Sequence, residues 1–104
     1  MDYKLKITEH AQELLDQLIY HLIYNLNNDQ AAKHLLDEVE KIFDRLEENP
    51  EQFPKCKDKY LEEKGYREAI VQHMNYLVIF NIEDDKINIV GIFHQLENYQ
   101  DKIS

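Results

Sequence analysis

The sequence predicts an α+β domain in which two amphipathic helices cover one face of a small antiparallel sheet. Three observations support this fold class: an N-terminal segment in which apolar residues alternate with lysines, two long segments within residues 8–49 that repeat apolar residues every three or four positions, and three β-rich segments after residue 65. A chain of 104 residues suits a single core, so residues 1–104 are expected to form one domain.

Local patterns define the first strand and the first helix. In Tyr3–Ile7 the alternation has a period of two, as in a strand with one buried face. Thr8 offers a hydroxyl that can cap the following helix, which is expected to end near Asn25–Asn27. The apolar stripe of this helix comprises Ala11, Leu14, Leu15, Leu18, Ile19, Leu22 and Leu26.

A second helix begins after a very short connection. Asn28 is placed to cap this helix, and Asn49–Pro50 ends it, because a residue before proline disfavours helical geometry. Short links make neighbouring helices antiparallel, so residues 8–49 are expected to form a helical hairpin. The second stripe comprises Ala32, Leu35, Leu36, Val39, Ile42, Phe43 and Leu46.

Three strands are predicted after a surface connection. Residues 50–65 contain two prolines and mixed charge, and this loop can include a turn of helix around Lys59–Lys64. The segments Tyr66–Val71, Asn75–Ile82 and Lys86–His94 are separated by linkers of hairpin length. They are therefore expected to form a three-stranded antiparallel meander, which gives the element order β-α-α-β-β-β.

Both faces of this sheet are apolar. Tyr76–Phe80 is apolar at both alternating sets of positions, and the last strand is expected to place Ile87, Ile89 and Phe93 on one face with Val90 and Ile92 on the other. Two helices cover only one face. The second face must therefore meet a loop, the C-terminal tail, a second subunit of a homodimer or a partner protein.

Composition excludes several classes of function. The net charge is −9, and residues 8–49 hold ten acidic side chains against three basic ones, which argues against a general nucleic-acid binder. One cysteine and five histidines without metal-ligand spacing predict no metal site, and two glycines leave no phosphate-binding loop, so no cofactor is expected. No segment has the length of a membrane span or the pattern of a signal peptide, so a cytoplasmic protein is expected.

One polar cluster has the residue types of a phosphodiester site. Cationic side chains stabilise developing negative charge, and histidine or tyrosine transfers protons. The same residues also have simpler explanations: lysines in a loop are usually solvated, the arginine can pair with Glu68, and the tyrosine can anchor the tail. The cluster comprises Lys55, Lys57, Lys59, Arg67, His94 and Tyr99.

The order of these segments resembles the RelE/ParE superfamily of bacterial type II toxin–antitoxin toxins, also known as plasmid stabilisation proteins, over nearly the whole chain. The resemblance lies in "ENPEQFPKC", "GYREAIV", "NYLVIFNIEDDKINIVGIFH" and the tail "QLENYQDKI". It implies a growth-inhibiting toxin that a cognate antitoxin neutralises. RelE-type relatives are metal-independent, ribosome-dependent endoribonucleases that cut mRNA, whereas ParE-type relatives poison DNA gyrase.

The resemblance also implies roles for individual residues. Arg67 matches the family's arginine on the first strand of the hairpin, His94 matches an aromatic or histidine position at the end of the last strand, and Tyr99 matches a frequent tyrosine of the tail. These three residues are therefore the candidate catalytic residues. Many relatives carry two arginines after the last strand, where this chain has Leu96 and Glu97. This difference weakens the ribonuclease interpretation, so that gyrase inhibition and RNA cleavage rank level. An inactive paralogue that acts only as a protein-interaction module is the alternative.

Two further sets of residues are expected to bind partners. The lysines of the connection are expected to contact the target or RNA, and they comprise Lys55, Lys57, Lys59 and Lys64. An antitoxin segment is expected to cover the second face of the sheet, at Tyr76, Val78, Val90 and Ile92.

Overall fold

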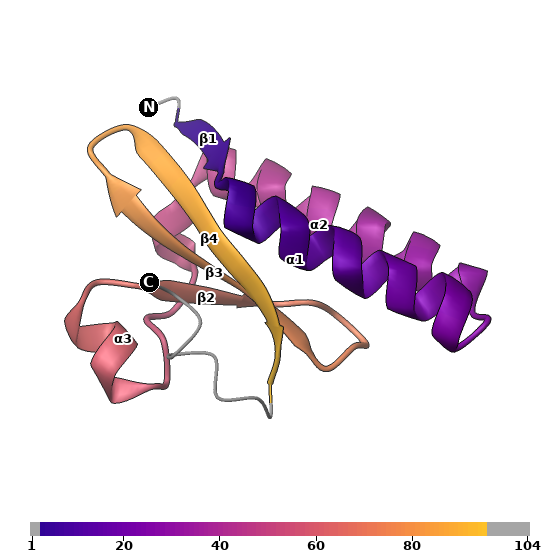
Figure 1. Ribbon diagram of the computed structural model, residues 1–104. Coiled ribbons are helices and arrows are strands. Elements are labelled where there is room, and N and C mark those ends of the chain that lie inside the picture. Colours follow the sequence, from indigo (N-terminus) through magenta and orange to yellow (C-terminus); the bar gives the residue numbers. More distant parts are fainter. Residues whose placement is uncertain (1–2, 96–104) are drawn as a thin grey trace.

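The computed structural model describes residues 3–95 and consists of a helical layer packed against one face of a four-stranded sheet (Figure 1). Both long helices lie on the same side of the sheet, and the predicted order of elements is confirmed. The elements are β1 (Lys4–Ile7), α1 (Glu9–Tyr20), the π-helix η1 (His21–Asn25), α2 (Asp29–Glu48), the 3-10 helix η2 (Pro50–Gln52), α3 (Lys59–Glu63), β2 (Arg67–Ile70), β3 (Tyr76–Glu83) and β4 (Lys86–His94).

Side-chain caps begin both long helices at the predicted residues. The Thr8 hydroxyl accepts a hydrogen bond from the backbone N–H of Ala11 at 3.1 Å, and the Asn28 side chain accepts one from Ala31 at 3.0 Å. These bonds satisfy N–H groups that have no partner within the helix. They confirm the predicted starts of the two helices, and Figure 1 shows α1 and α2 side by side, as in the predicted hairpin.

The sheet differs from the predicted three-stranded antiparallel meander. The strand order is β1-β4-β3-β2, and β1 runs parallel to β4, so the sheet is mixed. Backbone bonds from Lys4 to Asp85 and from Thr8 to Ile89, at 2.8 and 3.1 Å, join the N-terminal strand to β4. The physical reason is that a three-stranded meander leaves one edge of β4 without backbone partners, and β1 supplies them.

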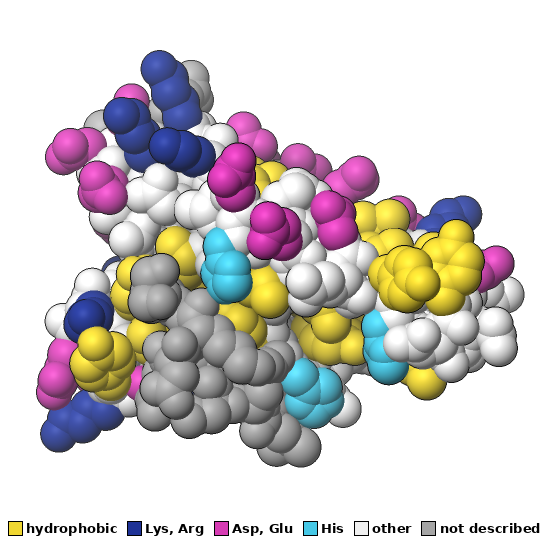
Figure 2. Space-filling view, in the orientation of Figure 1, with side chains coloured by type: hydrophobic (Ala, Val, Ile, Leu, Met, Phe, Trp, Pro, Cys, Tyr) yellow, Lys and Arg dark blue, Asp and Glu magenta, His cyan; other side chains and the backbone are white. Residues whose placement is uncertain are grey.

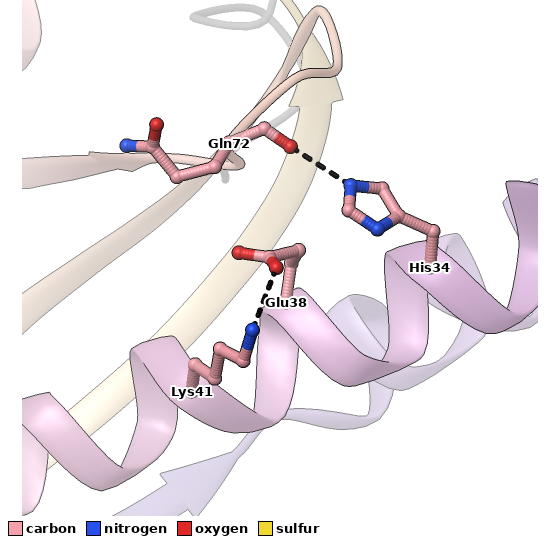
Figure 3. Close-up of polar contacts among 4 residues, drawn as sticks. All are labelled: His34, Glu38, Lys41 and Gln72. Carbon is pink, nitrogen blue, oxygen red and sulfur yellow. Dashed lines mark hydrogen bonds and ion pairs between the residues drawn. The ribbon is translucent and has the colours of Figure 1, made fainter.

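Helix α2 is tied to the loop between β2 and β3. The His34 ring donates a hydrogen bond from Nε2 to the carbonyl oxygen of Gln72 at 3.1 Å (Figure 3). One turn further along, the buried Glu38 carboxylate pairs with the Lys41 ammonium at 3.0 Å. The bond to Gln72 spans 38 positions of sequence and joins the helical layer to the sheet.

A β-bulge in β4 changes which side chains face the helices. Ile79 pairs with Gly91 while Phe80 pairs with Ile89, so Val90 has no partner of its own on β3. An extra residue reverses the alternation beyond it. Ile92 therefore joins the core beneath the helices, and Phe93 lies on the opposite face. The predicted faces of these two side chains were wrong for this reason.

The second face of the sheet is not free. It carries a buried cluster that includes residues of the connection between α2 and β2, so the chain itself covers part of this face. A loop was one of the coverings that the sequence left open. The buried members are Cys56, Leu61, Leu77, Ile79 and Phe93.

Candidate functional site

The segment around Lys55 extends the sheet beyond β2. Lys55 forms an antiparallel bridge with Arg67, and backbone hydrogen bonds on either side of it join Cys56 to Tyr66 and Glu68 to Pro54 at 3.0 and 3.1 Å. The predicted polar cluster is therefore partly assembled by backbone pairing. Lys55 and Arg67 share the face of the helices, because directly paired residues point to the same side.

The side chain of Arg67 is engaged within the protein. Its Nη1 donates a hydrogen bond to the carbonyl oxygen of Phe53 at 2.7 Å. The Phe53 ring is buried and meets the Phe80 ring edge-on at 5.9 Å, while the Arg45 guanidinium lies 4.6 Å from the ring centroid. Arg67 thus binds the backbone of Phe53 while Arg45 packs on its ring. The hydrogen bond from Arg67 joins the connection between α2 and β2 to the sheet.

Glu68 occupies the opposite face of the same strand. It is 2% exposed, and its carboxylate accepts a hydrogen bond from the backbone N–H of Lys57 at 3.0 Å. Burial beside this carboxylate and Asp58 raises the pKa of the Cys56 thiol to about 12, with desolvation as the largest cause. A thiol with such a pKa stays protonated near neutrality, so Cys56 is not an activated nucleophile.

The four predicted target-binding lysines are all exposed, and acidic residues alternate with them. The Lys64 ammonium lies 4.5 Å from the centroid of the Tyr60 ring, and its hydrogen bond with that side chain raises the lysine pKa. Asp58, Glu62 and Glu63 belong to the same short segment. The exposed lysines are Lys55, Lys57, Lys59 and Lys64.

His94 and Arg67 lie apart on the sheet, on the two strands that flank β3. His94 pairs with Tyr76 on β3, and their rings meet edge-on at 5.7 Å. Arg67 pairs with Phe80, four residues away on the same strand. With about 3.3 Å per residue and about 4.8 Å between strands, the two Cα atoms lie roughly 16 Å apart. The arrangement does not bring these two candidate catalytic side chains together, and Tyr99 lies outside the described residues.

Of the four residues predicted to bind an antitoxin on the second face of the sheet, three lie on the face of the helices instead. Val78 and Ile92 are 1% and 5% exposed and belong to the core beneath the helices, not to the second face. Tyr76 also packs against this core, which leaves Val90 on the second face. The bulge in β4 explains why Ile92 faces the helices. Val78 faces them because it pairs directly with Ala69, which belongs to the same core.

A small apolar cleft opens between the helices and the sheet. It is shallow and open to solvent, with room for about one water molecule. Ile7, at 38% exposure, is its most accessible large side chain, and Leu15 and Phe43 reach it from the two helices. Val78 and Ile92 form part of its floor. The cleft offers apolar contact without a polar group suited to catalysis.

No group of three or more His, Cys, Asp or Glu side chains among residues 3–95 is arranged to hold a metal ion. Within the same range, no helix is long and apolar enough to cross a lipid bilayer.

Comparison with known proteins identifies the family. A family model described as the ParE toxin of the type II toxin–antitoxin system parDE matches residues 5–99. The chain belongs to the ParE toxin family. This match confirms the resemblance to the RelE/ParE superfamily.

A solved structure supports the fold of this ParE-family chain. It is described as the chromosomal ParDE toxin–antitoxin system from P. aeruginosa, and its similar chain has a TM-score of 0.72 at 18% sequence identity. The match covers 88% of the present chain and 95% of the other. No curated protein sequence matches the ParE-family chain at a significant level.

Sequence analysis missed one surface feature of this ParE-family protein. Tyr20 and Tyr24 are 60% and 66% exposed, and their ring centroids are 4.7 Å apart. Both fall outside the apolar stripe of the first helix, at a spacing of four residues. Two tyrosines four residues apart on the solvent side of an amphipathic helix would have predicted this exposed pair.

Proposed function

We propose that this protein is a toxin that inhibits DNA gyrase and that a cognate antitoxin neutralises it. The match of the ParE toxin model to residues 5–99 is the observation that carries this proposal. Within the superfamily, the ParE type is the one that the resemblance links to gyrase. The alternative target is mRNA at the ribosome.

The spacing of the candidate catalytic residues favours a protein target. RNA cleavage needs a cation and a proton-transfer group at one phosphodiester. His94 pairs with Tyr76 at the start of β3, whereas Arg67 pairs with Phe80 four residues further along. The Arg67 guanidinium is bound to the Phe53 carbonyl, in the segment next to the outer edge of β2. The described part of the chain therefore supplies no convergent pair for that reaction.

Charge supports the same choice. Acidic side chains are spread along the visible face of the helical pair (Figure 2), and the chain carries a net charge of −9. An RNA phosphate backbone is repelled by such a surface, whereas a protein target is not. The exposed lysines of the connection lie among acidic residues and do not form an extended basic stripe.

The apolar cleft between the helices and the sheet is the proposed site for the antitoxin. Its exposed Ile7, with Leu15 and Phe43 on the two helices, offers an apolar surface on which a side chain of the antitoxin can pack. Apolar burial of this kind drives most protein association. Replacing Ile7 with Asp is expected to weaken neutralisation while toxicity persists.

The decisive experiment compares the two targets in one preparation. Purified protein is added to gyrase holoenzyme with relaxed plasmid, and in parallel to a translating ribosome extract with a labelled message. We expect loss of supercoiling with intact mRNA, and reversal of this effect by the antitoxin encoded beside the toxin. Cleaved mRNA with normal supercoiling would favour the ribonuclease alternative. If neither changes and induced expression leaves growth unaffected, the inactive paralogue is the better description.

A further inference from the structure

Two histidine rings lie close together where helix α2 meets the loop between β2 and β3. His34 belongs to α2 and His73 to the loop, and their ring centres are 6.2 Å apart at an inclination of 42°. His73 is exposed and His34 is partly buried. The two residues are far apart in the sequence, so no short spacing of metal ligands could have predicted this pair.

The hydrogen bond to Gln72 fixes which nitrogen of the neutral His34 ring carries the proton. A carbonyl oxygen only accepts hydrogen bonds, so the proton is on Nε2, which lies 3.1 Å from that oxygen. Nδ1 then carries the lone pair, and Figure 3 shows that it points away from the Gln72 carbonyl. Most metal-bound histidines donate their other N–H in this way, because the hydrogen bond orients the ring and makes the ligating nitrogen more basic.

The loop between β2 and β3 holds His73 beside this ring. The backbone N–H of Val71 donates a hydrogen bond to the Tyr76 carbonyl at 2.9 Å, and that of Met74 donates one to the Val71 carbonyl at 3.3 Å. His73 has a φ of 64°, in the left-handed region that histidine and asparagine adopt more readily than most residues. The loop is therefore a closed turn that presents the His73 side chain next to α2.

The distance between the rings suits one metal ion between them. An imidazole nitrogen binds zinc at about 2.0–2.1 Å, which places the ring centre about 3.2 Å from the ion and limits two rings on one ion to about 6.4 Å. The observed 6.2 Å lies within this limit. A tetrahedral angle at the ion corresponds to about 5.2 Å, so the exposed His73 ring has to move by about 1 Å.

We propose that Nδ1 of His34 and the ring of His73 bind a divalent transition-metal ion of the zinc class, with water in the remaining positions. Imidazole suits such ions, whereas magnesium and calcium prefer oxygen ligands. The Glu38 carboxylate is paired with Lys41 at 3.0 Å, so it is not counted among the ligands, and the site consists of two protein groups. The bound ion links α2 to the loop, next to the hydrogen bond at Gln72.

Calorimetric titration of the full chain with Zn²⁺ tests this site. The wild type is expected to bind one ion per chain and to unfold at a higher temperature with Zn²⁺ but not with Mg²⁺. His34→Gln and His73→Asn are each expected to weaken binding at least about tenfold, because a single imidazole cannot chelate. Glutamine can still donate to the Gln72 carbonyl, and asparagine tolerates the left-handed backbone. His10→Gln, at an exposed histidine of α1, is the matched control and is expected to bind Zn²⁺ like the wild type.

Nuclear magnetic resonance of the histidine rings identifies the nitrogen that binds the ion. Long-range ¹H–¹⁵N spectra are expected to show a Zn²⁺-dependent shift of His34 Nδ1 while Nε2 keeps its proton. This measurement uses the wild type, so it does not depend on the folding of any variant. The proposal is overturned by a wild type that does not bind Zn²⁺, by a His34→Gln or His73→Asn protein that binds it like the wild type, by equal stabilisation with Mg²⁺, or by Zn²⁺ on Nε2 of His34.

Discussion

The guanidinium of Arg67 donates a hydrogen bond to the backbone carbonyl of Phe53 at 2.7 Å, and this contact joins the connection after α2 to the sheet. Arg67 was predicted as a catalytic residue. Because its guanidinium also binds the Phe53 carbonyl, an Arg67 variant can lose stability as well as activity. A loss of toxicity in an Arg67 variant has two explanations, and stability measurements distinguish them.

Replacing Arg67 with Ala is expected to lower the free energy of unfolding by about 1.5–3 kcal/mol, because a hydrogen bond from a charged donor is lost. Urea unfolding followed by circular dichroism measures this change. Arg45→Ala is the control, because Arg45 lies over the same Phe53 ring but is exposed, and it is expected to cost less than about 1 kcal/mol. An Arg67→Ala protein of unchanged stability that has lost toxicity would contradict the structural role and indicate contact with the target.

Glu68 is expected to be the more sensitive residue of β2. Glu68→Ala leaves the backbone N–H of Lys57 without its acceptor, and we expect a loss of about 2–3 kcal/mol. Glu68→Gln is expected to lose less, because the amide oxygen can still accept that hydrogen bond. The same urea experiment compares both with Glu40→Ala, an exposed position on α2. Equal stabilities of Glu68→Ala and Glu40→Ala would rule out this role.

Cys56 is expected to lower the free energy of unfolding as the pH rises above about 9. Its pKa is raised in the folded state from the ordinary value of 9.0 to about 12, so the unfolded chain loses this proton first. The contribution of the protonated thiol to the free energy of unfolding is therefore fully present below about pH 9, and it declines as the pH rises from 9 toward 12. Chemical unfolding at several pH values, compared with Cys56→Ala, isolates the effect from other titrating groups. Identical pH dependence of the two proteins would show that the thiol does not contribute.

The burial of Cys56 also predicts its reactivity. At 1% exposure, the thiol is expected to resist a disulfide reagent at pH 8 in the folded protein and to react fully after unfolding in urea. Release of the coloured thiolate measures both rates. Rapid labelling of the native protein would mean that the segment around Cys56 opens readily.

His34 is expected to contribute to the attachment of α2 to the sheet. Its replacement with Ala removes the hydrogen bond to the Gln72 carbonyl and should lower stability by about 1 kcal/mol. Amide hydrogen exchange in the loop between β2 and β3 should become faster in this variant. Lys33→Ala, at the neighbouring exposed position, is expected to change stability by less than about 0.5 kcal/mol. A His34 variant that behaves like Lys33→Ala would show that the bond is dispensable.

The sequence by itself determined the features that depend on neighbouring residues. The caps at Thr8 and Asn28 and the bounds of the last strand, Lys86–His94, agree with the structure. Helical stripes, caps and strand alternation arise from contacts within a few positions, so a local pattern is sufficient to predict them. The family resemblance also needed only the order of these segments, and the ParE match confirmed it.

Only the tertiary structure decided which side chains share a face and which partner each strand takes. The bulge at Val90 arises from the register between β3 and β4, and glycine suits position 91 because an added Cβ atom would clash with the Phe93 ring. Neither contact can be read from an alternating pattern, since one extra residue reverses it. The parallel pairing of β1 with β4 and the separation of Arg67 from His94 have the same origin, because they depend on how distant segments align across the sheet.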